Sequence, residues 1–286
     1  MTAERKKAFV PLRKERADDI IQLAEAVADE YCPTGHVEPL LIAKKNKILT
    51  VFNDYGDYFD GMLEHSNNAF CIFCNLGRVE KQDSPRARFT IAHELGHYYI
   101  DDHRIALASG KTPKHASRCE FESSEIVEQE ADLFASHLLL PTSRFTKKTR
   151  GQATGLKSIL AAAGDLRASV TSTAIRYVKA DFVPCTLIKW NKDGFQWKHL
   201  STETFRARFH KTIELVSQVA EGSATHKAIM GTPPPQAGFF ENATTAAAWF
   251  PFLGDLDSRN QLFMEQAIPI GRFGVLTLLF PIDGRL

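Results

Sequence analysis

The residues with the clearest chemical meaning form the pentapeptide His93-Glu94-Leu95-Gly96-His97. In a helix, side chains four residues apart lie on one face, so the two imidazoles can share a metal ion. Glu94 then stands where it can take a proton from the attacking water. The usual chemistry of this arrangement is hydrolysis of a peptide bond. The alternative is a surface helix that happens to carry two histidines.

The sequence around the pentapeptide predicts a half-buried helix. Ser84 followed by Pro85 is typical of a helix start, with an N-cap and a proline in the first turn. Apolar residues then recur at spacings of three and four, as such a helix requires: Phe89, Ala92, Leu95, Tyr99 and Ile100. The two histidines border this stripe, so the metal is expected at the edge of a core.

A catalytic zinc site needs a third protein ligand, and a second predicted helix offers one. This helix covers residues 128–140, and Pro141 ends it. We expect Glu128 to bind the metal and Asp132, one turn later, to accept a hydrogen bond from a ligand histidine. An ordinary acidic helix start is the alternative for this pair. Glu130 points elsewhere on the helix and is expected in solvent.

His103 competes for the role of third ligand because it follows His97 by six residues. That spacing belongs to metalloproteases whose chain turns sharply at a glycine after the second histidine. Here Ile100 occupies the glycine position, and a β-branched residue resists the positive φ of such a turn. We therefore prefer Glu128 as the ligand and expect His103 at the C-terminus of the motif helix.

Together the two segments resemble the ImmA/IrrE family of bacterial metallopeptidases. The resemblance rests on Arg-x-Arg-Phe-Thr-Ile-Ala-His-Glu-Leu-Gly-His-Tyr and Glu-x-x-Ala-Asp-x-Phe-Ala-x-x-Leu-Leu-Leu-Pro, and it covers roughly residues 10–145. It implies a gluzincin-like domain of helices and a small sheet, with Zn²⁺ held by His93, His97 and Glu128 and with Glu94 as the base. Such ligands also accept Mn²⁺. The implied substrate is an XRE-type (Cro/CI-like) repressor, whose cleavage switches on stress, prophage or mobile-element genes.

Composition indicates a globular protein with no general attraction to nucleic acid or membrane. Of 286 residues, 44% are hydrophobic, and 35 Lys and Arg stand against 34 Asp and Glu. No run approaches the ~20 apolar residues that a membrane span requires. The five cysteines are scattered and odd in number, so we expect reduced thiols in the cytoplasm. Cys71 and Cys74 lie in a predicted strand and are expected in the core.

We expect an α+β chain in three parts: a metallopeptidase domain over residues 1–150, a helix-turn-helix-like unit over 151–181 and a sensor-like (GAF-like) α+β domain over 182–286. In the last part the pattern predicts a hairpin over 183–200, with Asp-Gly in its turn. The other expected elements are a helix over 213–220 and strands within 246–252 and 262–280.

In the first part, the pattern predicts a helix over 17–31, strands over 40–52 and 68–76, and a polar loop over 106–124. The strand over 68–76 either presents its edge to an extended substrate or lies buried in the middle of a sheet.

Four basic residues outside the motif raise the question of other ligands. Arg86 and Arg88 could hold a substrate carboxylate, although pairing with local acids is preferred. Arg176 and Lys179 could meet DNA phosphates, but two cations make a thin footprint, so partner docking is preferred. The alternative function is a non-catalytic DNA- or partner-binding regulator with a structural metal, which would need a fourth protein ligand.

Overall fold

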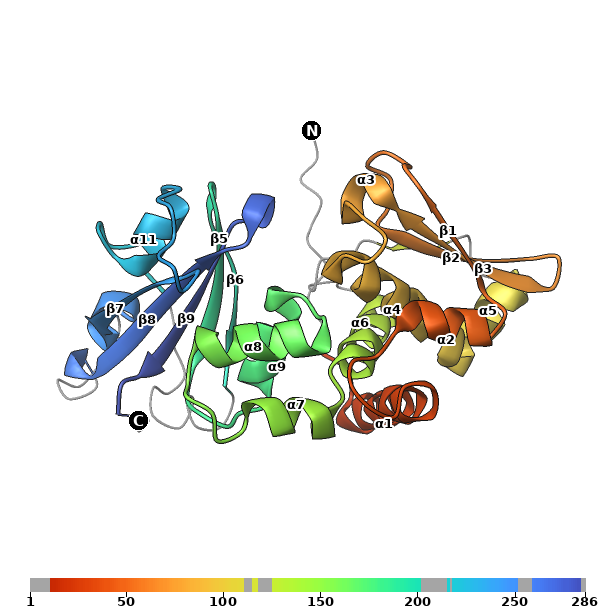
Figure 1. Ribbon diagram of the computed structural model, residues 1–286, viewed down its shortest axis with the longest axis horizontal. Helices are drawn as coiled ribbons and strands as arrows, with labels where there is room; N and C mark the ends of the chain where they lie inside the picture. Colours follow the sequence, from red (N-terminus) through yellow and green to blue (C-terminus); the bar gives the residue numbers. More distant parts are fainter. Residues whose placement is uncertain are drawn as a thin grey trace. The chain divides into compact units, whose positions relative to one another are not determined.

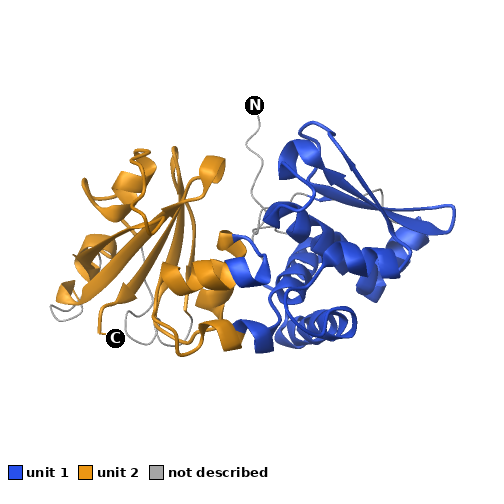
Figure 2. Ribbon diagram, in the orientation of Figure 1, with its two compact units in different colours: residues 1–145, 164–169 blue, residues 146–163, 170–286 orange. Residues whose placement is uncertain are grey.

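The computed structural model describes residues 11–110, 115–117, 125–201, 215–216, 218–251 and 259–283. The chain divides into two compact units (Figures 1 and 2). Unit 1 comprises Met1–Phe145 and Gly164–Ser169, and unit 2 comprises Thr146–Ala163 and Val170–Leu286. Each unit combines helices with one sheet, so the α+β class is confirmed, while the three-part division stays a prediction. Within the described ranges, no helix has the length and apolar character to span a bilayer.

The sheet of unit 1 has four strands in the order β1-β3-β2-β4. Their bounds are Leu49–Asn53 for β1, Gly61–Ser66 for β2, Ala69–Asn75 for β3 and His115–Ser117 for β4. β3 pairs in parallel with β1 and antiparallel with β2. The predicted strand over 68–76 is therefore confirmed, but its edge is not available to a substrate, because both of its hydrogen-bonding sides are taken by neighbouring strands.

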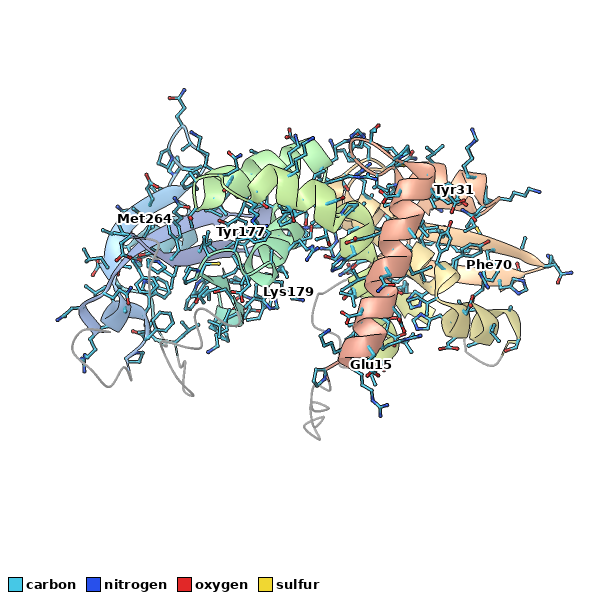
Figure 3. All side chains as sticks on the ribbon, turned by 90° about the horizontal axis from the view of Figure 1, so that it is seen from below. Glu15, Tyr31, Phe70, Tyr177, Lys179 and Met264 are labelled. Atoms are coloured by element: carbon cyan, nitrogen blue, oxygen red, sulfur yellow. The ribbon has the colours of Figure 1, made fainter. Side chains whose placement is uncertain are left out.

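The helices of unit 1 pack around this sheet. Their bounds are Lys14–Tyr31 for α1, Pro39–Lys45 for α2, Leu76–Val79 for α3, Pro85–Tyr99 for α4, Asp101–Ala108 for α5 and Ile126–Leu139 for α6. α4 lies between the sheet and α6, and α1 packs along α6. Figure 3 labels Glu15 and Tyr31 near the two ends of α1. The inner stripe of α1, with Ile20, Ala24 and Val27, is buried as its spacing predicts.

Two predicted segments of unit 1 are wrong in part. The strand expected over 40–52 is helix α2 followed by β1, because Pro39 starts a helix that only the turn at Asn46 ends. The polar loop expected over 106–124 begins inside α5 and includes β4, and the residues 111–114 and 118–124 lie outside the described part.

Unit 2 contains a five-stranded antiparallel sheet in the order β6-β5-β9-β8-β7. The strands are Thr186–Asn191 for β5, Gly194–Leu200 for β6, Phe240–Thr245 for β7, Leu262–Pro269 for β8 and Val275–Pro281 for β9. The other elements are α7 (Thr142–Thr149, which begins in unit 1), α8 (Leu156–Leu166), α9 (Val170–Lys179), α11 (Ala224–Ile229), α12 (Ala246–Trp249) and a 3₁₀ turn at Gly271–Phe273. The predicted hairpin is confirmed by β5 and β6, and the strands expected within 262–280 are confirmed by β8 and β9. The sheet carries an aromatic core that includes Trp190, Trp249 and Phe263.

Two predictions for unit 2 differ from the structure. The segment 246–252 begins with helix α12, and the strand lies just before it as β7. Of the helix expected over 213–220, residues 213, 214 and 217 lie outside the described part, and the others are not helical. The helix that packs on β7, β8 and β9 is α11, which starts at the N-cap Ser223.

Candidate metal centre

α4 places the two histidines of the motif side by side in the interior. Ser84 caps the helix by accepting a hydrogen bond from the Ala87 amide, and Pro85 occupies the first turn, as predicted. His93 and His97 follow on one face, and both are buried. Their Nε2 atoms lie 3.2 Å apart. The helix therefore presents two imidazole nitrogens to one point.

α6 brings the carboxylate of Glu128 to the same point. Glu128 Oε2 lies 3.4 Å from His93 Nε2, and Oε1 lies 3.3 Å from His97 Nε2. One ligand atom from each of the three residues lies within 4.8 Å of the others. Two imidazole nitrogens and a carboxylate oxygen are a donor set that suits zinc and other divalent ions. Among the described residues, the group therefore fits a divalent metal ion with three protein ligands.

A close crossing of the two helices makes this convergence possible. A Cβ added at Gly96 of α4 would lie 3.1 Å from the Ala131 Cα and 3.3 Å from the Phe134 Cβ of α6. Such contacts are tight, so a glycine at this position lets the helix backbones approach each other. The glycine inside the motif thus helps to set the distance between the histidines and Glu128.

Asp132 contacts the first histidine on the side away from the other ligands. Its Oδ1 lies 2.8 Å from His93 Nδ1, in the position expected from the sequence. A carboxylate at Nδ1 keeps a proton there, so Nε2 is the ring nitrogen that is available to a metal ion. Burial lowers the pKa of His93, but hydrogen bonds to Asp132 and Glu128 outweigh burial and raise the pKa well above its usual value.

The second histidine has a different partner, which the sequence reading missed. His97 Nδ1 lies 3.2 Å from His103 Nδ1, and His103 Nε2 lies 3.0 Å from Glu130 Oε2. Burial is the largest influence on His97 and lowers its pKa to about 4, which keeps the imidazole neutral, as a metal ligand must be.

Two expectations about these partners are therefore wrong. His103 lies in the first turn of α5 rather than at the end of the motif helix, because the extended Ile100 ends α4 and turns the chain. It faces Nδ1 of His97, the ring nitrogen opposite the ligand group, so it does not join His93 and Glu128. Glu130 is buried rather than solvated, because α1 covers that face of α6.

Glu94 lies between α4 and the start of β2 and is fully buried. A Cβ added at Gly61 would lie 2.7 Å from Glu94 Oε1 and would overlap the Thr90 methyl group. Gly61 therefore leaves the space that the Glu94 carboxylate occupies. Nothing in the sequence distinguished Gly61, since its importance comes from a strand that is distant along the chain.

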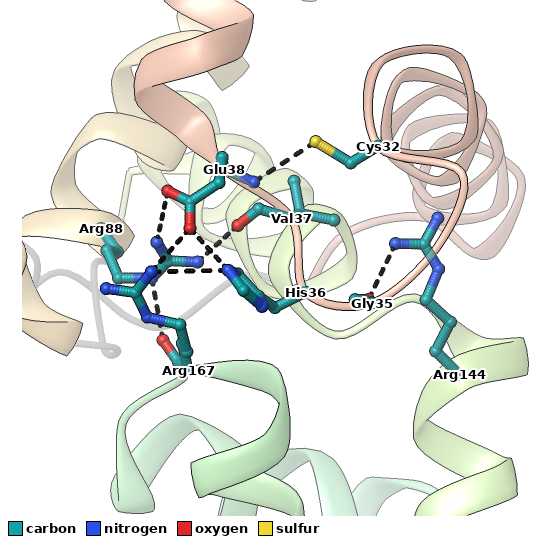
Figure 4. Close-up of polar contacts among 8 residues, drawn as sticks. All are labelled: Cys32, Gly35, His36, Val37, Glu38, Arg88, Arg144 and Arg167. Atoms are coloured by element: carbon teal, nitrogen blue, oxygen red, sulfur yellow. Dashed lines mark hydrogen bonds and ion pairs between the residues drawn. The ribbon is translucent and has the colours of Figure 1, made fainter.

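The two arginines near the start of α4 hold the fold together. Arg86 bonds the buried Asp60 at 2.8 Å. Arg88 donates to Glu38 at 2.9 Å, to the Val37 carbonyl and to the Arg167 carbonyl at 2.9 Å (Figure 4). Both are paired within unit 1, in agreement with the preferred expectation.

Comparison with known proteins finds a family match over the segment that contains the candidate metal centre. Residues 71–176 match the peptidase family described as the IrrE N-terminal-like domain. Residues 71–176 are therefore similar to an IrrE N-terminal-like domain. This match includes both histidines, Glu94 and Glu128, and it extends into α9. The expected resemblance to the ImmA/IrrE family is thereby confirmed, and the family supports a metallopeptidase-like activity.

A solved structure has the same general fold. A Mycobacterium tuberculosis transcriptional regulator aligns with a TM-score of 0.57 at 13% identity, over 94% of this chain and 79% of that one. At this identity the likeness concerns the fold alone. No curated protein sequence matches the chain.

Proposed function

We propose that the protein is a zinc-dependent endopeptidase. The observation that carries this proposal is the buried group of His93, His97 and Glu128, with Glu94 next to His93 in the same helix and buried against Gly61 of β2. These three residues would hold the ion, and Zn²⁺ suits them best, with Mn²⁺ as the other choice. When bound, such an ion acts as a Lewis acid on the substrate carbonyl and on the attacking water.

The protein's own residues carry out the other parts of the proposed mechanism. Glu94 accepts the proton of the attacking water and returns it to the leaving amine, as a general base and then a general acid. Asp132 holds the tautomer of His93 through its bond to Nδ1. The close packing of Gly61 and Thr90 fixes the Glu94 carboxylate before substrate arrives.

Glu94→Gln tests the base. The amide has nearly the same shape but cannot accept the proton, so we expect proteolysis to fall about 100- to 10,000-fold. Metal content measured by mass spectrometry should stay at the wild-type value, because the ligands are intact. The exposed Glu15→Gln in α1 is the matched control and should keep full activity. Wild-type proteolysis in the Glu94 variant rules out this mechanism.

We further propose that the substrate is an XRE-type repressor and that its cleavage derepresses stress, prophage or mobile-element genes in the cytoplasm. The family resemblance supports this proposal. Incubation of the metal-loaded protein with a repressor encoded beside its gene should give discrete fragments, mapped by mass. An intact repressor, with a general peptide substrate cleaved, would reject the repressor and retain the peptidase.

Direct DNA contact is the weaker proposal for the helix-turn-helix-like unit. On α9, Lys179 is exposed and Arg176 is half-buried, so at most a small basic surface faces solvent there. A gel-shift assay over increasing salt tests it, because loss of several phosphate contacts gives a steep salt dependence.

A further inference from the structure

A chain of buried polar side chains extends from the second ligand histidine to the first helix. It runs from His97 through His103 and Glu130 to Arg16, with distances of 3.2 Å, 3.0 Å and 2.7 Å between successive partners. His97, His103 and Glu130 are 3%, 7% and 5% exposed. Burial of polar groups is unfavourable unless each finds a partner, so this arrangement is a specific feature of the fold.

One assignment of protons gives every hydrogen bond in this series of side chains a donor and an acceptor. With Nε2 of His97 used for the metal beside Glu128 and His93, its ring proton is on Nδ1 and is donated to Nδ1 of His103. His103 then carries its own proton on Nε2 and donates it to Glu130. Each imidazole is thereby held in one tautomer, with an acceptor facing a donor at every step.

Arg16 completes the series by neutralising the buried carboxylate of Glu130. Its Nε lies 2.9 Å from Glu130 Oε1, and its Nη2 lies 2.7 Å from Oε2, which is a bidentate geometry. Glu130 therefore remains an acceptor for His103.

Three separate elements meet in this series. His103 comes from α5, Glu130 from α6 and Arg16 from the first turn of α1. Ile100, which is extended and buried, turns the chain between α4 and α5 so that His103 folds back onto His97. The arrangement depends on tertiary packing rather than on the motif itself.

We propose that His103, held by Glu130 and Arg16, is a positioning residue that orients His97 for metal binding. The proposal rests on the metal site proposed above. The two ligand histidines then have unequal supports, since His93 meets the Asp132 carboxylate directly and His97 meets a neutral imidazole with the carboxylate behind it.

His103→Ala tests the proposal through metal affinity. Loss of the acceptor frees the His97 ring, so we expect the dissociation constant for Zn²⁺, measured by chelator competition, to rise about 10- to 100-fold. The visible absorption bands of the Co²⁺-loaded protein should change as well, because they report ligand geometry. His103→Asn returns an acceptor near the position of Nδ1 and should recover most of the affinity.

The matched control is His137→Ala. His137 is a buried histidine at the other end of α6, and its Nδ1 lies 3.2 Å from Glu25 of α1. Its loss should lower the melting temperature to an extent similar to His103→Ala while leaving the Zn²⁺ affinity and the Co²⁺ bands unchanged.

The outcomes separate this proposal from the peptidase. If wild type binds Zn²⁺ and His103→Ala binds it within twofold, the positioning role is refuted and the metal site stands. If both histidine variants weaken binding equally, the effect is general destabilisation, which also refutes the role. If wild type itself binds no divalent metal, the proposed function and this inference fail together.

Discussion

At the scale of single residues, the position of Glu94, the candidate base, depends on Gly61, which has no side chain opposite it. Glu94 is buried next to β2, and Gly61 has no side chain at the point of closest approach. Thr90, one turn before Glu94 and also fully buried, closes the same space. The carboxylate therefore has few alternative positions, which is what a preorganised base requires.

Gly61→Ala should displace the base without removing a ligand. The new methyl group would lie 2.7 Å from Glu94 Oε1, and the flexible end of the glutamate is the part that can move. We expect kcat to fall at least tenfold, with Zn²⁺ affinity close to wild type and a loss of about 1–3 kcal/mol in unfolding free energy. Steady-state kinetics and chelator competition check these values.

Gly164→Ala is the control for this substitution. An added Cβ there meets nothing within 4 Å, and alanine favours a helix by up to about 1 kcal/mol over glycine. Activity should be unchanged. Equal kcat values for Gly61→Ala and wild type would show that Glu94 tolerates the methyl group and that the tight fit has no catalytic meaning.

At the scale of elements, the crossing of α4 and α6 sets the size of the ligand group. The histidines come from one helix and Glu128 from the other, so their separation follows the distance between the helices. Gly96 lies at the closest point, against Ala131 and Phe134. The glycine of the motif therefore has a packing role as well as a place in the pentapeptide.

Gly96→Ala should widen this crossing. Alanine is the better helix former, but its Cβ would lie 3.1 Å from the backbone of Ala131, which cannot rotate away. We expect Zn²⁺ affinity to fall at least tenfold, measured by chelator competition, together with a lower melting temperature. A Gly96→Ala variant that is more stable and keeps the wild-type Zn²⁺ affinity would contradict this prediction. It would show that α4 and α6 accommodate the methyl group without moving apart.

The sequence predicted local features and missed the contacts between elements. Ser84, Pro85 and the apolar spacing defined α4, and the acidic pair with Pro141 defined α6, because capping and periodicity are local signals. Glu130 was placed in solvent because nothing in its own helix shows that α1 covers that face. His103 was placed at a helix end because one extended residue, Ile100, decides where α4 stops. The order of the strands, which places β3 between β1 and β2, likewise depends on pairing over long distances.

At the scale of the whole molecule, the two units carry different reporters. His93, His97 and Glu128 are in unit 1, whereas Trp190, Trp197 and Trp249, the three tryptophans of the chain, are in unit 2. Tryptophan fluorescence therefore follows the second unit. Far-ultraviolet circular dichroism follows the long helices α1, α4 and α6 of the first unit as well.

Metal removal should shift the melting transition followed by circular dichroism but not the transition followed by fluorescence. A ligand that binds only the folded state stabilises it by about 2.7 kcal/mol at roughly 100 times its dissociation constant. We expect a chelator to lower the melting transition seen by circular dichroism and to leave the fluorescence transition in place. Equal shifts of both transitions would show that the units unfold as one.

The first helix has a reach that its sequence does not suggest. α1 contacts α6 at two points, where Arg16 bonds Glu130 and Glu25 bonds His137. Hydrogen bonds from His137 and Thr142 outweigh burial and lower the pKa of Glu25 to about 2. α1 thus stabilises α6, the helix that supplies Glu128. Substitution of Arg16, more than sixty residues before the pentapeptide, therefore reaches the ligand group through Glu130 and His103, a connection that an inspection of the motif alone would overlook.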